Sequence, residues 1–551
     1  GLAGCSPQAS SDAASAGASD ASAASGFTAA GGPSFLTAPS PIADSDIKET
    51  VEADIVIVGA GLSGISAARA AVESGAKNIV VVEKATTWQY RSNQVGCIGG
   101  KIQEDLGIHI DKNAAVGQIM KECGYRPNQR ILNLWADNSG EAFDWFLAAS
   151  EGQYVVEAES DTYDGKSMSV RKMHWPHPAE ANIADDFYPI FDDCQICLPD
   201  NGPYIQNMVD ICEKAGVQFL YSTFARQLVR PDNAGRVEGV IVEDENGDYK
   251  KITASKAVLL ATGDYASNAE MMSYYVPWSD RFMSIFPNVD AKGEKTNTGD
   301  GQQMGMWIGA KMEDGPHAPM THHLGGPLGM DAFLLVDING ERFMNEQNMA
   351  FDPLVYSGQA GLNNGNYYVL VDGEYYDACV AEGVYKHLGE PDWNFGREMF
   401  YPVLSHAPEQ FEAAVSEGWA VKGDTIAECA EAFGLTNLEE TVKRYNEFCQ
   451  SKEDADFGKD PMFLTEIKDG KGYYLFEYQS AYWATIGGIR TNDRLTALDA
   501  DNKPIDGLFI GGLNMGSAFC RPYYDIPGTA CGLSIASGVT GAKEIIQYLE
   551  A

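Results

Sequence analysis

Three glycines with the spacing G-x-G-x-x-G are the residues of this chain with the clearest chemical use. Gly59, Gly61 and Gly64 follow the unbroken apolar run 55–58 and precede a helix that we predict over 63–74. In such a unit the first glycine permits a tight turn, the second lets backbone approach a pyrophosphate, and the third lets helix and strand pack. The amino-terminal end of the helix then faces the phosphates.

An acidic residue stands where a dinucleotide would need one. The apolar run 79–82 predicts a second buried strand, and Glu83 ends that strand about 20 residues after the glycines. A carboxylate in this place accepts a hydrogen bond from a ribose 2′-hydroxyl. Strand, helix, strand and terminal acid predict a Rossmann-like βαβ unit that binds an adenine dinucleotide.

Two later segments predict further strands. Residues 236–243 alternate apolar and polar side chains, and Asn246-Gly247 follows them as a hairpin turn. The apolar run 257–261 leads into Gly263, which predicts a buried strand that ends in a turn.

Composition excludes some function classes. The 551 residues allow two or three domains and a large core. A formal charge of −39 argues against nucleic acid as a partner, which needs a basic footprint. The acidity favours solubility, and docking of a basic partner such as a cytochrome is the alternative. The sequence has no continuous run of 18 or more apolar residues, which a membrane-spanning helix would need.

The eleven cysteines show no regular spacing. One C-x-x-C pair, Cys194 and Cys197, could ligate a metal or an iron–sulfur cluster, but a second pair is missing. We therefore expect buried thiols rather than a cluster, and we predict no metal site.

The beginning of the chain predicts an anchored tether. Leu2-Ala3-Gly4-Cys5 resembles the lipobox of bacterial lipoproteins, in which the cysteine is lipidated. Residues 6–41 are dominated by Ala, Ser and Gly and predict a flexible linker. We therefore expect residues 1–49 to tether the folded part outside the cytoplasmic membrane, attached to it through the lipid only.

Several motifs together resemble one family. They are Arg91–Gly100, Ala261-Thr262-Gly263-Asp264-Tyr265, Asn297–Gly301, Asp337–Glu346, Thr485–Ile489, Leu508–Gly512 and Tyr524–Gly532. With these motifs, residues 50–551 resemble the flavoproteins of fumarate reductases and succinate dehydrogenases. That family includes 3-ketosteroid dehydrogenases and gut-bacterial enone and enoate reductases such as digoxin reductase.

The resemblance implies FAD as cofactor. Some relatives attach the flavin through a histidine where this chain has Asn93, so non-covalent FAD is expected here. The residues expected at FAD are Gly59, Gly61, Leu62, Ser63, Gly64, Glu83, Lys84, Ser92, Gly99, Gly100, Thr262, Gly263, Asp300, Gly512, Gly528 and Leu533.

The resemblance also implies the architecture. We expect an α/β fold with a Rossmann-like FAD-binding domain of the glutathione-reductase type and an inserted α+β cap domain. The first part of the FAD-binding domain would span residues 50–316, the cap 317–484, and the second part of the FAD-binding domain 485–551.

The catalytic candidates are less regular. Tyr524 and Gly528 match the ketosteroid dehydrogenase pair in which a hydroxyl and a backbone N–H bind a substrate carbonyl, although a packed core tyrosine is the alternative. Glu346 ends the cap motif, and His317 is the nearest match to an active-site histidine, with a structural role as the alternative. The family's proton-donating arginine or tyrosine is replaced by Ala350, and its substrate histidine by Ala484.

Four functions fit these residues. The first is reduction of a carbon–carbon double bond conjugated to a carbonyl, with hydride from flavin N5. A fumarate- or urocanate-type terminal reductase, a 3-ketosteroid-type dehydrogenase and a non-catalytic tethered flavoprotein are the alternatives. A dicarboxylate reductase needs cationic clamps, which Ala350 and Ala484 do not supply.

Electrons require a separate donor. No haem motif or second flavin domain is visible in the sequence, so a membrane cytochrome or a quinol-linked partner is implied. The expected substrate is a small enone, enoate or lactone.

Overall fold

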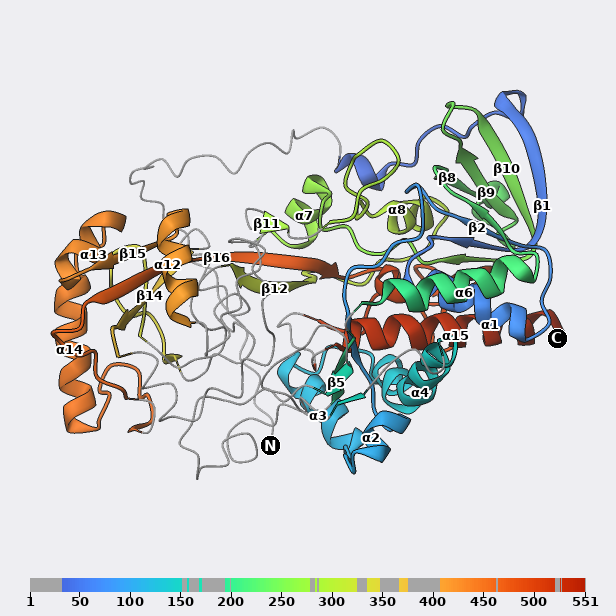
Figure 1. Ribbon diagram of the computed structural model, residues 1–551. Helices are drawn as coiled ribbons and strands as arrows, with labels where there is room; N and C mark the ends of the chain where they lie inside the picture. Colours follow the sequence, from blue (N-terminus) through green and yellow to red (C-terminus); the bar gives the residue numbers. More distant parts are fainter. Residues whose placement is uncertain are drawn as a thin grey trace, which may run out of the picture.

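We describe a computed structural model of the chain (Figure 1). The structure describes residues 32–150, 156–157, 168–170, 194–198, 200–277, 283–284, 287–324, 334–346, 366–374, 407–461, 464–520, 526 and 528–550. None of the helices in these segments is both long and apolar enough to cross a membrane.

The larger body of the molecule is built around a sheet of eight strands. The central strands of this sheet are parallel (Figure 1). Its main path runs β17-β18-β10-β1-β2-β7, and β8 and β9 continue it beside β10. The strands are β1 (Ile47–Val58), β2 (Ile79–Val82), β7 (Gln218–Leu220), β8 (Phe224–Val229), β9 (Gly239–Glu243), β10 (Tyr249–Leu260), β17 (Thr496–Leu498) and β18 (Pro504–Ile510). Because β1 lies between β2 and β10, its carboxyl end is a switch point of the kind where such sheets bind ligands.

The sequence predicted the centre of this sheet. Residues 55–58 are buried on both faces, as predicted, and α1 (Leu62–Glu73) agrees with the predicted helix to within one residue. β1 begins earlier than predicted, because residues 47–53 pair with the first half of β10. The predicted hairpin is also confirmed, since β9 and β10 are antiparallel and Gly247 adopts a positive φ of 82° in their turn.

Helices cover the sheet and fill the space around it. They are α1, α2 (Lys101–Asp105), α3 (Lys112–Glu122), α4 (Gln129–Ala148), α6 (Gly202–Lys214), α7 (Ala269–Tyr275), α8 (Asp300–Trp307) and α15 (Thr529–Glu550). The long carboxy-terminal helix α15 runs beside α1 and packs on α4 (Figure 1). A small sheet lies next to these helices, in the order β3 (Gln94–Gly96), β6 (Gln195–Cys197), β5 (Met168–Val170) and β4 (Val156–Glu157).

A third sheet extends away from this body (Figure 1). It contains β11 (Met283–Ser284), β12 (Ala318–Leu324), β13 (Leu335–Val336), β14 (Asn366–Asp372), β15 (Ala420–Gly423) and β16 (Tyr473–Ile486). The strands β12–β15 and most of β16 fall within residues 317–484, the predicted cap, as do α12 (Ala407–Glu417), α13 (Ile426–Phe433) and α14 (Leu438–Ser451), and these residues have a buried apolar cluster of their own. The strand β16 continues without a break across the predicted cap limit at residues 484 and 485.

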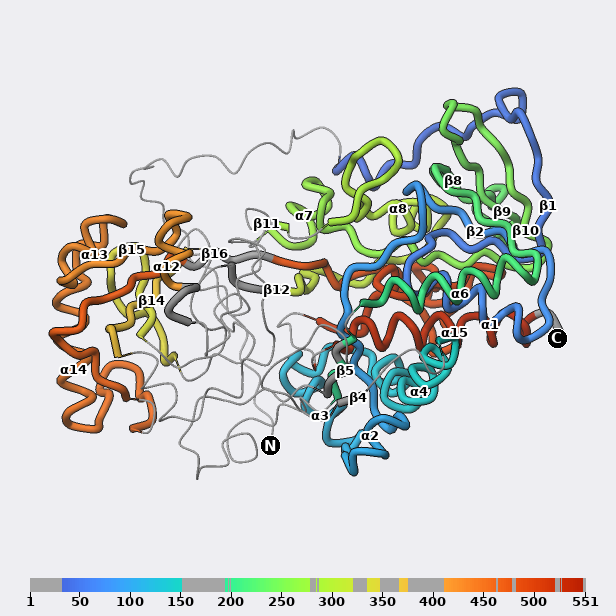
Figure 2. The backbone as a smooth tube through the Cα atoms, viewed as in Figure 1, coloured from blue at the N-terminus to red at the C-terminus, as the bar shows by residue number. Residues whose placement is uncertain are grey.

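The described end of the amino-terminal segment packs against the body of the molecule. Figure 2 shows it passing from β1 along one side of the molecule toward α7 and α8. Phe35 is buried against Tyr274 and Tyr275, and Trp307 donates a hydrogen bond to the Phe35 carbonyl at 2.8 Å. Residues 33–35, at the end of the predicted flexible linker 6–41, are therefore held in place by the Phe35 ring, by Trp307 and by bonds from Ser34 to Glu270, whereas residues 36–41 are exposed.

Candidate functional site

The three glycines of the turn between β1 and α1 are needed for two different reasons. Gly59 has φ of 109°, and a Cβ on it would lie 2.2 Å from the Ala261 carbonyl oxygen. A Cβ on Gly64 would lie 1.9 Å from the Gly59 carbonyl oxygen, so both glycines are required by the fold. Gly61 has φ of −90°, and a Cβ there would meet nothing closer than the Gln89 carbonyl oxygen at 3.9 Å. Neither backbone strain nor packing explains Gly61, but space kept for a ligand does.

Glu83 lies at the carboxyl end of β2, where the sequence placed it. Its two carboxylate oxygens accept from the backbone N–H groups of Ala60 and Ala85, both at 2.8 Å. Burial raises the pKa of Glu83, against the lowering by these two N–H donors. Each oxygen keeps a second lone pair, so the carboxylate can still accept from a ribose hydroxyl.

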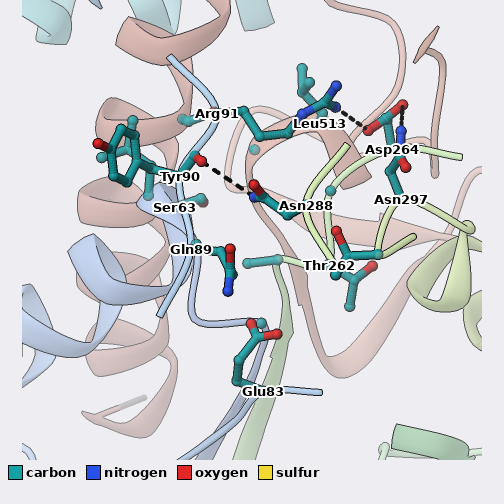
Figure 3. Close-up of a pocket in the computed structure, with 18 of the residues that line it drawn as sticks. Ser63, Glu83, Gln89, Tyr90, Arg91, Thr262, Asp264, Asn288, Asn297 and Leu513 are labelled. Atoms are coloured by element: carbon teal, nitrogen blue, oxygen red, sulfur yellow. Dashed lines mark hydrogen bonds and ion pairs between the residues drawn. The ribbon is translucent and has the colours of Figure 1, made fainter. Parts of the chain in front are cut away.

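A cavity of about 210 Å³ opens beside this turn and runs from Glu83 toward Arg91, Asp264 and Leu513 (Figure 3). Its walls come from the ends of β1, β2 and β10, from the loops that follow them, and from α15. The predicted FAD residues that line it are Gly59, Gly61, Leu62, Ser63, Glu83, Lys84, Ser92, Thr262, Gly263, Asp300 and Gly512.

Two polar networks hold the middle of the cavity. Lys84 donates to Asp300 at 2.8 Å and to the Thr298 hydroxyl at 3.0 Å. On the other wall, Asn514 accepts from the Thr262 backbone N–H at 3.0 Å and from the Thr262 hydroxyl at 2.6 Å. These contacts join segments more than 200 residues apart and fix the cavity walls.

An ion pair between the half-buried Arg91 and the buried Asp264 closes the end of the cavity away from Glu83. Arg91 donates to Asp264 at 3.2 Å, and Asp264 is 2% exposed (Figure 3). Asp264 stands where the resembling family has glycine. That departure was the available hint of a buried counter-ion, but neither residue was predicted to contribute to the site.

Other lining residues were also missed by the sequence reasoning. They are Val58, Val82, Gln89, Tyr90, Thr223, Ala225, Ala261, Asn288, Thr296, Asn297, Leu513, Ala530, Cys531 and Ser534. Most of them carry no motif and are brought to the cavity by the pairing of distant strands.

The remaining predicted cofactor residues lie around the cavity rather than on its described wall. Gly99 and Gly100 donate their N–H groups to Gln103, and Leu533 is buried in α15. Gly528 adopts φ of 79° and accepts from the Gly96 N–H at 2.8 Å. Direct contact of these residues with FAD stays a prediction.

The catalytic candidates are dispersed. His317 is fully buried: its Nδ1 accepts from the Tyr265 hydroxyl at 2.6 Å, and its Nε2 donates to the Glu313 carbonyl at 2.9 Å. Glu346 is buried in the cap, where it accepts two bonds from Arg342 at 2.8 Å. Neither side chain lines the described cavity, which favours the structural alternative for His317, and a catalytic role for Glu346 stays a prediction. Tyr524 and Ala350 lie outside the described residues.

The cavity fits FAD by the chemistry of its wall. The Ser63 hydroxyl and the Asn297 amide oxygen both line it, both are buried, and neither has a hydrogen-bond partner within the protein. The N-terminus of α1, Gly61 and Lys84 would receive the pyrophosphate, and Glu83 the ribose. Asn93, held through its side chain by the Asn201 N–H at 2.8 Å, does not have the imidazole needed to bond a flavin. Within the described segments, no three His, Cys, Asp or Glu side chains are placed to hold a metal ion.

Comparisons with known proteins agree on the cofactor. The model of the FAD binding domain family matches residues 54–520. Vinyl phenol reductase of Lactiplantibacillus plantarum is 24% identical over 90% of this chain and 96% of its own length. Urocanate reductase of Eggerthella lenta is 25% identical over 85% of this chain and 70% of its own length.

The fold has solved counterparts. A 3-ketosteroid-delta4-(5alpha)-dehydrogenase from Rhodococcus jostii RHA1 superimposes with a TM-score of 0.65 at 19% identity, over 92% of this chain and 99% of that one. This likeness confirms the predicted α/β fold. With the family match over most of its length, the chain belongs to the FAD binding domain family and is an FAD-dependent oxidoreductase.

Proposed function

We propose that this protein reduces a carbon–carbon double bond conjugated to a carbonyl or a similar electron-withdrawing group in a small organic acceptor. The proposal rests on one position. The dicarboxylate reductases of the resembling family have a substrate histidine there, and this chain has an apolar residue. Ala484, 3% exposed, occupies that position in β16 and pairs with Met320 of β12. Neither side chain can hold a substrate carboxylate, which favours an acceptor of low charge.

The reaction adds two electrons and two protons to the double bond. When bound, FAD would supply hydride, which is two electrons and one proton, from N5 to one carbon, and an acid must protonate the other carbon. Tyr524 and the Gly528 N–H would donate to the carbonyl oxygen and stabilise the negative charge that develops there. Gly528 precedes α15, so an oxygen at this N–H also meets the positive end of a long helix.

Relatives support the reaction class but differ in substrate. The names vinyl phenol reductase and urocanate reductase describe proteins that reduce conjugated acceptors, whereas the 3-ketosteroid relatives are named as dehydrogenases. The deciding experiment supplies reduced viologen to the FAD-loaded protein and offers enones, enoates, lactones, a vinyl phenol, urocanate and fumarate. Viologen oxidation with an enone, a lactone or an uncharged enoate ester is expected. Turnover of fumarate or urocanate alone would overturn the proposal in favour of a carboxylate-specific reductase.

Tyr524→Phe tests the proposed carbonyl site. Losing one of two oxyanion donors typically lowers turnover by about 100- to 1,000-fold. FAD content and reduction of the flavin by viologen should stay unchanged. A variant that turns over the best substrate at the wild-type rate would remove Tyr524 from the mechanism, and loss of FAD would indicate a packing role.

We also propose that the enzyme works outside the cytoplasmic membrane and receives electrons from a membrane cytochrome or a quinol-linked donor. The motif Leu2-Ala3-Gly4-Cys5 and the acidic surface support this. Cells fed an alkyne-tagged fatty acid should label the wild-type protein and not Cys5→Ser. Equal labelling of both would contradict the lipid anchor.

A further inference from the structure

The ion pair at the end of the FAD cavity also holds a strand. Arg91 and Asp264 both line the cavity, and both bond to β16. Arg91 donates to the Trp483 carbonyl, and the Asp264 carboxylate accepts from the Thr485 N–H at 2.9 Å and more weakly from its hydroxyl at 3.4 Å. The two charged groups therefore bond to the main chain on either side of a single β16 residue, Ala484.

The strand they hold reaches into the cap. Residues 473–479 of β16 pair with β14, and residues 473–476 also pair with β15, in the part that has its own apolar cluster. Residues 479–486 pair with β12 and end beside the cavity. One continuous strand thus connects the cap sheet to the wall of the FAD site (Figure 1).

We propose that the Arg91–Asp264 pair is a clamp through which FAD fixes the end of β16, and with it the position of the cap. Asp264 is the positioning residue. Its carboxylate is buried and accepts from Arg91, Ala266 and Thr485, so a displaced β16 would leave a buried charge short of donors. FAD in the cavity confines the Arg91 and Asp264 side chains that line it, which keeps these bonds formed.

Such coupling is reciprocal. If FAD stabilises the clamp, the clamp must strengthen FAD binding by the same factor. This inference rests on FAD binding, which the family establishes, and not on the substrate, so it stands or fails independently of the proposed reaction.

Hydrogen exchange of the full chain, with and without FAD, tests the clamp in four proteins. They are the wild type, Asp264→Asn, Arg91→Gln and the control Arg69→Gln. Arg69 is chosen as the control because, like Arg91, it bonds one carboxylate, that of Glu73, and one main-chain carbonyl, that of Trp145. It lies on α1 and does not line the cavity.

In the wild type, FAD should slow exchange of the Thr485 amide, whose N–H bonds Asp264. Asp264→Asn and Arg91→Gln should lose this FAD-dependent protection, and their FAD dissociation constants should rise by about 5- to 150-fold, the usual range of coupling between sites. Arg69→Gln should keep the protection even if its overall stability falls.

Two results would overturn the clamp. One is full FAD-dependent protection of Thr485 in Arg91→Gln and Asp264→Asn. The other is equal loss of protection in Arg69→Gln, which would show that any buried arginine of this domain has the same effect. If Asp264→Asn does not fold, Arg91→Gln still decides, since Asp264 then keeps its backbone donors.

Discussion

Gly59 and Gly61 are two residues apart and yet are needed for different reasons. Substituting Gly59 should damage the fold, because it combines a positive φ with a 2.2 Å approach to the Ala261 carbonyl. Substituting Gly61 should leave the fold intact, since the nearest protein atom to a new Cβ is 3.9 Å away. The side chain would instead enter the space of the pyrophosphate.

We therefore predict that Gly61→Val folds without FAD. Its melting temperature should match that of the wild-type apoprotein, and its flavin absorbance after purification should be absent. Gly59→Ala serves as the contrast and should destabilise the apoprotein by about 1–3 kcal/mol, the usual cost of such backbone strain. Full flavin occupancy in Gly61→Val would show that the ligand lies elsewhere.

Glu313 and His317 form a buried pair with opposite pKa shifts. Burial raises the pKa of Glu313 from 4.5 to about 8, although the Ser517 N–H donates to its carboxylate. Burial lowers the pKa of His317 from 6.5 to about 4. Both side chains are therefore neutral in the folded protein at pH 7, and the two bonds of His317 place its proton on Nε2.

The pair predicts how stability depends on pH. Between pH 4.5 and 8 the unfolded chain loses the Glu313 proton that the folded protein keeps, so stability falls as pH rises. Between pH 6.5 and 4 the unfolded chain gains a proton at His317, so stability falls as pH falls. These opposing effects cancel where they overlap, and the Glu313 effect remains alone above pH 6.5.

Denaturant unfolding at pH 6.5 and 8 should show this. Relative to Glu313→Gln, which cannot ionise, the wild type should lose up to about 1.4 kcal/mol of unfolding free energy per pH unit. Parallel curves for the two proteins would mean that Glu313 ionises normally in the fold.

At the scale of residues, the sequence predicts roles that depend on neighbours in the chain. It does not predict which residues far apart in the chain form pairs. The turn glycines and Glu83 could be assigned because each role depends on neighbours within one βαβ unit. Arg91 and Asp264 are 173 residues apart, so only the fold shows that they pair. His317 was predicted from a motif, but the direction of its side chain depends on packing against Tyr265 and Tyr275.

At the scale of elements, the cap motif forms a buried ionic network. Arg342 bridges Glu346 and Asp454, with bonds of 2.8–3.0 Å to both carboxylates. Lys459 lies 3.5 Å from Glu346, and burial lowers the pKa of Lys459. Two basic and two acidic groups thus balance inside the cap, where an unpaired charge would be strongly destabilising.

We predict that Glu346→Gln destabilises the cap by about 3–5 kcal/mol, the usual effect of removing one charged partner of a buried ion pair. Limited proteolysis should cut the cap sooner, while FAD content stays the same. Glu341→Gln is the matched control, since Glu341 is exposed on the same motif and its carboxylate accepts from the Asn437 side chain, a bond that glutamine can keep. Normal melting combined with lost turnover in Glu346→Gln would instead favour the catalytic role predicted from sequence.

Elements were predictable where their patterns were strong. The run 55–58 and the Asn246-Gly247 turn correspond to observed structure because buried parallel strands and tight hairpins leave clear patterns. The docked segment around Phe35 was missed because its composition resembles a linker. Its position depends on the contacts of Phe35 with two tyrosines and with Trp307, and on bonds from Ser34 to Glu270.

At the scale of the whole molecule, charge bears on the choice of substrate. The chain carries a net charge of −39, so a dianion needs local cations to enter and bind. The basic side chains that line the described cavity, Lys84 and Arg91, are each paired with a carboxylate. The position of the resembling family's substrate histidine is Ala484.

We therefore predict that fumarate is a poor substrate and that its dimethyl ester, which has the same double bond without the charges, is a better one. Each missing charge-assisted hydrogen bond to a carboxylate costs about 1.5–3 kcal/mol. The kcat/KM for fumarate should then be at least about tenfold below that for the ester, at equal ionic strength and after subtraction of the rate without protein. Both compounds accept hydride at equivalent carbons, but the neutral ester is intrinsically the better electrophile, so the ratio of kcat/KM values is divided by the ratio of the rates at which free reduced flavin reduces the two compounds. A higher kcat/KM for fumarate would mean that the protein supplies cations from residues other than those described, and would place this enzyme with the dicarboxylate reductases.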